Sequence, residues 1–181
     1  MDPDTPARVA DVLGTLAIAG SIATVLLVVG LLVPSAQARI VATIGGSGTA
    51  LAAGIAAVAM GGSLWFSESA GFPPCELCWY QRIAMYPLVV VLAVASWRGE
   101  RSARLIAALL AGAGLIVNVW HNVIETNPEL AGDSCDPDNP CTLRWVEGLG
   151  FWTIPRLAGV CFVLILLLTA IDHLADPGAD S

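Results

Sequence analysis

The chain has 181 residues, of which 56% are hydrophobic and 13% are charged, and its formal net charge is −7. The hydrophobic share exceeds the roughly 45–50% that soluble domains use, so the composition indicates an integral membrane protein. All eight basic residues are arginines, and they form no basic stripe. Nucleic-acid binding is therefore excluded, because it needs clustered Lys and Arg to neutralise phosphates.

Five apolar segments predict membrane-spanning helices, which need about 17–25 residues each. They cover residues 12–33, 41–66, 79–97, 105–121 and 151–171. The six tryptophans lie at the ends of these segments or just outside them, where the headgroup region favours amphipathic rings. The first segment follows an acidic leader and is longer than the apolar core of a signal peptide, about 7–15 residues, so we expect it to be retained.

Positive charge orients the chain, because short cytoplasmic connections are enriched in Arg and Lys. Three arginines crowd the connection between the third and fourth segments: Arg98, Arg101 and Arg104. That connection is predicted to be cytoplasmic, which places the loops at 67–78 and 122–150 outside, the N-terminus outside and the C-terminus inside. The expected location is a cell membrane that the chain crosses several times.

Four of the five cysteines lie in the two loops predicted to be outside, where disulfides persist. Cys75 and Cys78 form a Cys-x-x-Cys pair, a spacing suited to dithiol–disulfide exchange. Two prolines directly before Cys75 mark a helix start, and a helix N-terminus favours the thiolate. Cys135 and Cys141 form the second pair. Cys161, in the middle of the last segment, is expected to be a small buried hydrophobe.

Two further polar residues lie at the depth of the first cysteine pair. Arg82 follows Cys78 at i+4, so the two should share one helix face near the hydrocarbon boundary. An arginine inside a span costs about 2.5–3.5 kcal/mol at the centre and is by default a functional hypothesis, with snorkelling to the interface as the alternative. His121 ends the fourth segment, and its imidazole can donate a hydrogen bond to a carbonyl. Alone, it would more often be an interfacial capping residue.

Other interpretations of the cysteines remain open. Four thiolates can bind zinc, but structural zinc pairs are spaced C-x2–4-C and five residues separate Cys135 from Cys141, so no metal is predicted. Two inert structural disulfides are the other alternative. Apolar residues among polar ones at 142–150 predict either a short helix on the outer leaflet or a loop pinned by Trp145.

The cysteine motif and several flanking segments resemble the DsbB/BdbC family of disulfide bond formation proteins, with the BdbC branch more similar. The resemblance rests on Cys75-Glu76-Leu77-Cys78-Trp79-Tyr80-Gln81-Arg82, Ile83-Ala84-Met85-Tyr86-Pro87, Trp120-His121-Asn122, Cys135 with Cys141, and Gly150-Phe151-Trp152-Thr153-Ile154-Pro155. It covers about residues 41–171 and leaves out the first segment. The domain expectation is a tail and extra helix at 1–40, a membrane domain at 41–173 and a polar tail at 174–181.

The resemblance implies an all-α membrane protein, a four-helix transmembrane bundle of DsbB type plus one extra N-terminal transmembrane helix. It implies an enzyme in the lipid bilayer that reoxidises an extracytoplasmic, DsbA-like thioredoxin-fold thiol oxidase. The electrons would pass to the membrane quinone pool, as ubiquinone or menaquinone. The rivals are an enzyme like vitamin K epoxide reductase and a membrane scaffold whose cysteines only staple its loops.

The resemblance also implies a role for each site residue. Cys135 would be attacked by the partner's thiolate, and Cys141 would exchange with Cys75. Cys78 would be the thiolate facing the quinone, and Arg82 and His121 would hold or polarise the quinone carbonyls. The short spacing of the outer pair and the extra first segment are departures from the family pattern.

Overall fold

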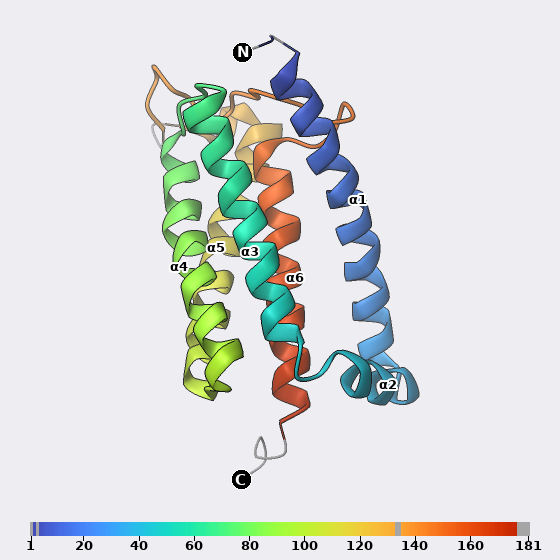
Figure 1. Cartoon of the computed structure of the whole chain (residues 1–181). Helices are drawn as coiled ribbons and strands as arrows, with labels where there is room; N and C mark the ends of the chain where they lie inside the picture. Colours follow the sequence, from blue (N-terminus) through green and yellow to red (C-terminus); the bar gives the residue numbers. More distant parts are fainter. Residues whose placement is uncertain (1, 3, 133–134, 177–181) are drawn as a thin grey trace.

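The computed structural model describes residues 2, 4–132 and 135–176, and over these residues it contains helices, turns and no β-strand. Figure 1 shows the elements in chain order: α1 Thr5–Leu32, α2 Pro34–Ile44, α3 Gly48–Leu64 with the π-helical turn η1 Trp65–Ser69, α4 Glu76–Arg98, α5 Arg101–Thr126, the 3-10 turn η2 Pro128–Leu130, and α6 Ile154–Leu174. Five of these helical stretches are long and apolar enough to cross a membrane: α1, α3 with η1, α4, α5 and α6. The predicted all-α membrane fold is confirmed.

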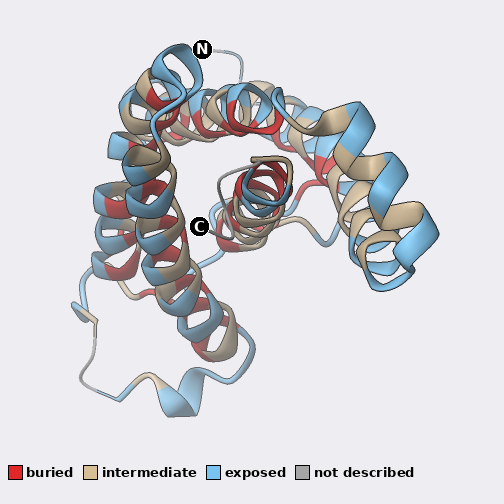
Figure 2. Cartoon of the chain, turned by 90° about the horizontal axis from the view of Figure 1, so that it is seen from below, coloured by how far each residue is buried: buried red, intermediate tan, exposed pale blue. Residues whose placement is uncertain are grey.

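Helices α3 to α6 form the bundle, and α1 stands beside it (Figure 1). Leu88 and Leu92 of α4 and Phe162 and Ile165 of α6 are fully buried in one core cluster. Buried residues lie on the helix faces that look toward the bundle interior, whereas exposed residues cover the outside (Figure 2). Many large apolar side chains are exposed on this surface, especially along α1, α4 and α5, as expected for helices that face lipid.

The predicted second segment was wrong in its start, because the helix breaks inside it. Residues 41–44 belong to α2, a separate short helix that the sequence did not predict, and α3 begins only at Gly48. Between them Gly46 has a φ of +88°, a conformation that favours glycine. Asp172 of α6 accepts hydrogen bonds from the backbone N–H groups of Gly46 (2.9 Å) and Thr49 (2.6 Å). A buried carboxylate therefore caps the start of α3.

Helices α4 and α5 form an antiparallel hairpin with a two-residue turn. Gly99 ends α4 in the left-handed region, at a φ of 67°, as helix C-termini commonly do. A side chain at Gly114 would come within 2.4 Å of the Phe162 ring and 3.0 Å of the Ala84 Cβ, so this glycine allows α5 to approach its neighbours. The hairpin places the start of α4 and the end of α5 at the same end of the bundle (Figure 1).

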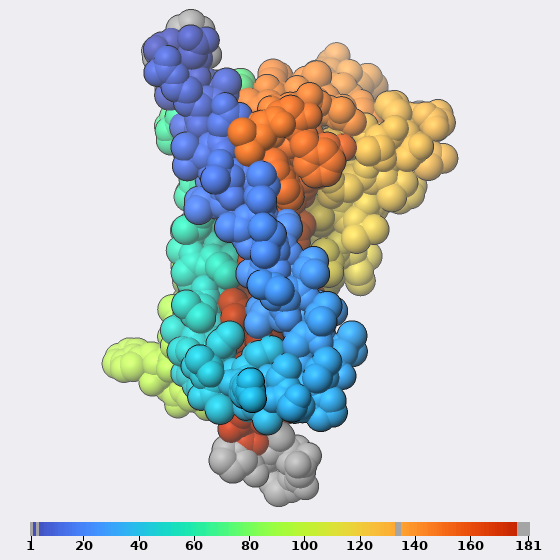
Figure 3. Space-filling view, turned by 90° about the vertical axis from the view of Figure 1, so that its right-hand side faces the viewer, coloured from blue at the N-terminus to red at the C-terminus, as the bar shows by residue number. Residues whose placement is uncertain are grey.

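Helix α1 packs through small residues against α6 and against the loop that precedes α6. Ala10, Gly14 and Ala17 are its buried positions, and a Cβ at Gly14 would lie 3.0 Å from the Trp152 ring. The N-terminal part of α1 is fixed where the Asp11 carboxylate accepts a hydrogen bond from the Leu149 N–H at 2.8 Å. Figure 3 shows α1 running obliquely in front of α6, with atoms of α6 visible between α1 and α3.

Candidate functional site

The Cys-x-x-Cys pair lies where α4 begins. Cys75 is the N-cap residue and is buried, and its sulfur accepts a hydrogen bond from the Cys78 N–H at 3.4 Å. The two free thiol sulfurs lie 2.7 Å apart. The Cys78 thiol, the His121 imidazole and the Cys78 N–H, in that order, hold the pKa of Cys75 well below that of an ordinary thiol, although burial opposes them. The pair is thus arranged to hold one thiolate and to close to a disulfide with little movement.

His121 lies buried behind this pair in a chain of side-chain hydrogen bonds. Its Nδ1 is 2.8 Å from Gln81 Nε2, and its Nε2 is 3.0 Å from the Cys141 carbonyl and 3.8 Å from Cys75 Sγ. Gln81 Oε1 in turn accepts a hydrogen bond from Asn118 at 2.9 Å. Because the amide nitrogen is a donor, Nδ1 is the acceptor and the ring proton is assigned to Nε2. His121 therefore directs an N–H toward both cysteine pairs.

The second cysteine pair forms a disulfide that packs on the N-terminal end of α4. Cys135 and Cys141 are bonded, with Cα atoms 5.9 Å apart. Cys141 is 2% exposed and belongs to one apolar cluster with Cys75, Leu77 and Ile124, against which Cys135 also packs. The two cysteine pairs are therefore neighbours, although the sequence separates them by most of two helices.

Contacts of the outer loop hold this disulfide in place. Asn139 donates to the Pro74 carbonyl at 3.1 Å, just before the Cys-x-x-Cys pair. The Trp145 ring stacks on Phe72 with centroids 5.1 Å apart. The alternative of a short helix at 142–150 was wrong: this segment consists of turns and one isolated bridge between Gly148 and Trp152. Trp145 holds the loop in place by stacking on Phe72.

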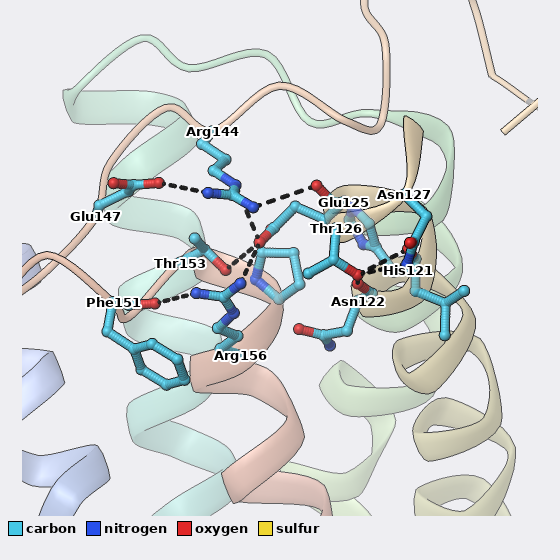
Figure 4. A network of polar contacts seen from close by, with 12 residues as sticks. His121, Asn122, Glu125, Thr126, Asn127, Arg144, Glu147, Phe151, Thr153 and Arg156 are labelled. Atoms are coloured by element: carbon cyan, nitrogen blue, oxygen red, sulfur yellow. Dashed lines mark hydrogen bonds and ion pairs between the residues drawn. The ribbon is translucent and has the colours of Figure 1, made fainter. Parts of the chain in front are cut away.

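A buried ion cluster fixes the same loop to α5 and α6 (Figure 4). Its centre is Glu125, whose side chain is 1% exposed and whose Oε1 lies 3.4 Å from both Arg144 and Arg156. Thr153 donates a hydrogen bond to the same oxygen at 3.1 Å. Arg144 also pairs with Glu147 at 2.9 Å. A buried carboxylate with two guanidinium partners and a hydroxyl donor is well satisfied and holds the loop against the helix ends.

Arg82, one helical turn beyond Cys78 on α4, lines a cavity of about 430 Å3. Its guanidinium donates to Ser63 of α3 through Nε to the hydroxyl (2.9 Å) and through Nη2 to the carbonyl (2.9 Å), and it lies 5.2 Å from the Trp79 ring centroid. Cys78 also lines this cavity, which agrees with the predicted shared helix face of Cys78 and Arg82. His121 of α5 lines it as well.

The rest of the cavity is apolar. Its lining comes mainly from α1, α3, α4 and α6. Its polar groups include two hydrogen-bonded pairs next to Cys78 in the fold, Arg82 with Ser63 and Gln81 with His121. Such a partly open apolar cavity, with a few convergent polar groups, fits a ligand that has a polar ring and an apolar tail. Cys161 is half-buried, packs against the core cluster and also lines the cavity, so it is less buried than we expected.

The first cysteine pair and His121 could in principle bind a metal ion. Cys75 Sγ, Cys78 Sγ and His121 Nε2 lie within 4.8 Å of one another. Two thiolates on a tetrahedral zinc ion would be about 3.8 Å apart, from Zn–S bonds of about 2.3 Å, whereas the sulfurs here are 2.7 Å apart. The geometry thus favours a redox pair over a shared metal ligand set.

The structure brings all six predicted site residues to one end of the bundle: Cys75, Cys78, Arg82, His121, Cys135 and Cys141. Sequence reasoning missed the second layer of polar residues around them. Gln81 and Asn118 could have been found as buried amides inside apolar helices, which are rarely placed there without a partner. Ser63 carried no signal, because a serine in a glycine-rich helix is unremarkable.

This arrangement defines the class: a multi-pass membrane protein with a Cys-x-x-Cys pair at a helix end and a disulfide-bonded loop packed on it. The family described as Disulfide bond formation protein DsbB matches residues 46–172. The chain belongs to this family. The match excludes α1 and α2, and the named role of the family, disulfide bond formation, agrees with a site made of two adjacent cysteine pairs.

Several relatives have disulfide formation in their names, and this chain aligns with most of the length of each of the two described here. Disulfide bond formation protein C of Bacillus subtilis (strain 168) is 40% identical over 114 residues, 62% of this chain and 83% of the relative. A probable disulfide formation protein of Oceanobacillus iheyensis is 40% identical over 113 residues, 61% of this chain and 78% of the relative. No solved structure shows significant similarity to the chain.

Proposed function

We propose that the protein reoxidises an extracytoplasmic, DsbA-like thiol oxidase and passes the electrons to a membrane quinone, which sustains disulfide bond formation. The observation that carries the proposal is the position of Cys78. Its thiol is in contact with Cys75, which packs with the outer disulfide, and it also lines the cavity beside Arg82. One cysteine pair thus connects a loop that a soluble protein can reach with a space that a lipid-soluble molecule can enter.

The outer exchange would start at Cys135, which is more exposed than Cys141. A partner thiolate attacks the Cys135 sulfur, and Cys141 leaves as the thiolate. The second partner thiol then displaces Cys135, so that the partner is oxidised and the outer pair is reduced. Cys141 next attacks Cys75 of an oxidised Cys75–Cys78 pair, which releases the Cys78 thiolate. Cys135 then attacks Cys141 and releases Cys75, so the Cys135–Cys141 disulfide re-forms and two electrons have moved to the Cys75–Cys78 pair. The His121 N–H, directed at the Cys141 carbonyl and at Cys75, holds these two residues in register.

The second half of the proposed reaction, electron transfer from the Cys75–Cys78 dithiol to a quinone, would take place at the polar end of the cavity. A bound quinone would supply an acceptor for two electrons and two protons, which re-forms the Cys75–Cys78 disulfide. Arg82 would hold one quinone oxygen, and it is itself oriented by its two hydrogen bonds to Ser63. His121 would hold the other oxygen by turning its Nε2–H away from the Cys141 carbonyl when the quinone binds. A fixed guanidinium stabilises negative charge that develops during reduction. We place this end of the bundle on the extracytoplasmic side, with residues 41–173 as the catalytic domain.

Quinone reduction by the purified protein tests the proposal. The protein in detergent is supplied with a reduced thioredoxin-fold dithiol oxidase and a quinone, and wild type is compared with Cys78→Ala. Turnover that requires both substrates and disappears in Cys78→Ala supports thiol-to-quinone electron transfer. Equal rates, or no turnover with several quinones together with disulfides that resist reduction, would favour a scaffold whose cysteines only staple its loops.

A further inference from the structure

The cavity beside Cys78 has one side that the DsbB-family region does not supply. Leu13, Leu16, Ala17 and Gly20 of α1 line it, whereas the family match begins only at residue 46. Leu13 also lies 3.5 Å from the position of a Cβ at Gly62, next to Ser63 in sequence. Helix α1 therefore reaches the cavity near its polar end and continues along it.

The residues of α1 that line the cavity are all apolar. The lining also includes apolar residues of the neighbouring helices, such as Leu51, Gly54 and Val58 of α3 and Val160 and Leu164 of α6. The polar groups of the cavity, including Ser63 and Arg82, come from the other helices. A ligand whose ring lies at Arg82 would thus have its apolar extension between α1, α3 and α6.

We propose that α1 completes the quinone site by binding the isoprenoid tail, with Leu16 and Ala17 in direct contact with it. The inference rests on the proposed function, because the tail belongs to the quinone that Cys78 would reduce. The occupant follows from continuity: the hydrocarbon space opens from the same cavity that contains Cys78 and Arg82. An isoprenoid chain has no polar atom, and neither do the α1 side chains that face it.

Two anchors keep α1 in position for this role. Asp11 receives the Leu149 N–H, and a Cβ at Gly148 would lie 2.2 Å from the Ala10 carbonyl oxygen, so backbone meets backbone there. Farther along, a Cβ at Gly20 would lie 3.0 Å from Val160, which brings α1 close to α6. The helix is therefore fixed to the outer loop and to α6 on either side of Ala17.

Substitution of Ala17 tests the inference, with a matched control on the same helix. Ala17→Phe places a ring in the cavity, whereas Ala19→Phe places the same ring at an exposed position that does not line it. Ala17→Phe should raise the KM for a quinone with several isoprene units by about 10-fold, the effect of an overpacked apolar site. It should leave the KM for a tail-less benzoquinone within about 2-fold, and Ala19→Phe should change neither.

The inference is overturned if Ala17→Phe affects the tailed and tail-less quinones equally, or affects neither. If wild type reduces neither quinone, the proposed function itself fails. A measurement on wild type covers the case in which Ala17→Phe does not fold: a quinone with a photoreactive group on its tail should label residues 13–20. Saturable labelling confined to α3–α6, with normal turnover, would retain the proposed function and remove α1 from the site.

Discussion

Replacement of Arg82 tests how the protein holds its electron acceptor. The guanidinium uses Nε and Nη2 on Ser63 and lies over Trp79, so its position beside the cavity is fixed before a ligand binds. A hydrogen bond to a charged group contributes about 1.5–3 kcal/mol. Arg82→Ala should therefore raise the KM for quinone by roughly 10- to 140-fold. Arg82→Lys keeps the charge but loses the two-point contact with Ser63, and an intermediate increase is expected.

The assay is steady-state quinone reduction, with quinone and reduced partner varied separately. Arg98→Ala is the matched control, because Arg98 has a 63% exposed side chain at the opposite end of α4. The control should leave both KM values unchanged. An Arg82→Ala protein with a normal KM for quinone and a raised KM for the partner would refute the reasoning. Arg82 would then serve the docking of the partner and not the cavity.

Three further predictions concern the supports of the site. Glu125→Gln leaves Arg156 without a charged partner and Arg144 with Glu147 alone, so it should destabilise this loop by about 3 kcal/mol and speed limited proteolysis there, whereas Glu129→Gln, on the exposed turn η2, should not. Asp172→Asn removes the charge that caps α3 and should reduce the free energy of unfolding by about 3 kcal/mol in denaturant titrations, with the KM for quinone unchanged; a changed KM would contradict the assignment. Because the pKa of Cys75 is lowered, its alkylation rate in the reduced protein should persist below pH 8, where an ordinary thiol of pKa about 8.5 loses reactivity, and Cys78→Ala should move the profile to higher pH.

Hydropathy predicted the membrane class and the number of spans. Motif spacing selected candidate site residues that the structure brings to one end of the bundle. These features depend on local chemistry: apolar length, arginine placement, and a thiol pair at a helix start. The break before α3 was missed because residues 45–47 lie inside an apolar run. The group that caps the start of α3 is Asp172, which is distant in sequence and accepts hydrogen bonds from the N–H groups of Gly46 and Gly48. The loop at 142–150 was harder still, because the stacking of Trp145 on Phe72 replaces the membrane contact that its pattern suggested.

The lateral position of α1 was also beyond the sequence. An apolar span has to cross the bilayer, but its hydropathy does not state which neighbour it contacts. The small residues Gly14, Ala17 and Gly20 were compatible with close packing, yet nothing indicated that their partner is α6 and that a cavity remains beside them. The same holds for Gln81 and Asn118, whose pairing requires the axial alignment of two helices.

The two-residue turn at Gly99 and Glu100 determines how residues of α4 and α5 align at the end of the bundle that contains the cysteines. Gln81 and Asn118, which are hydrogen-bonded across the hairpin, lie equally far along the chain from this turn, and so do Cys78 and His121. One residue inserted there would displace one helix by about 1.5 Å and rotate its side chains by about 100° relative to the other. The length of this short connection, at the opposite end of α4 and α5, thus fixes how the Cys75–Cys78 pair aligns with His121. The geometry of the redox site depends on this length as well as on the cysteines.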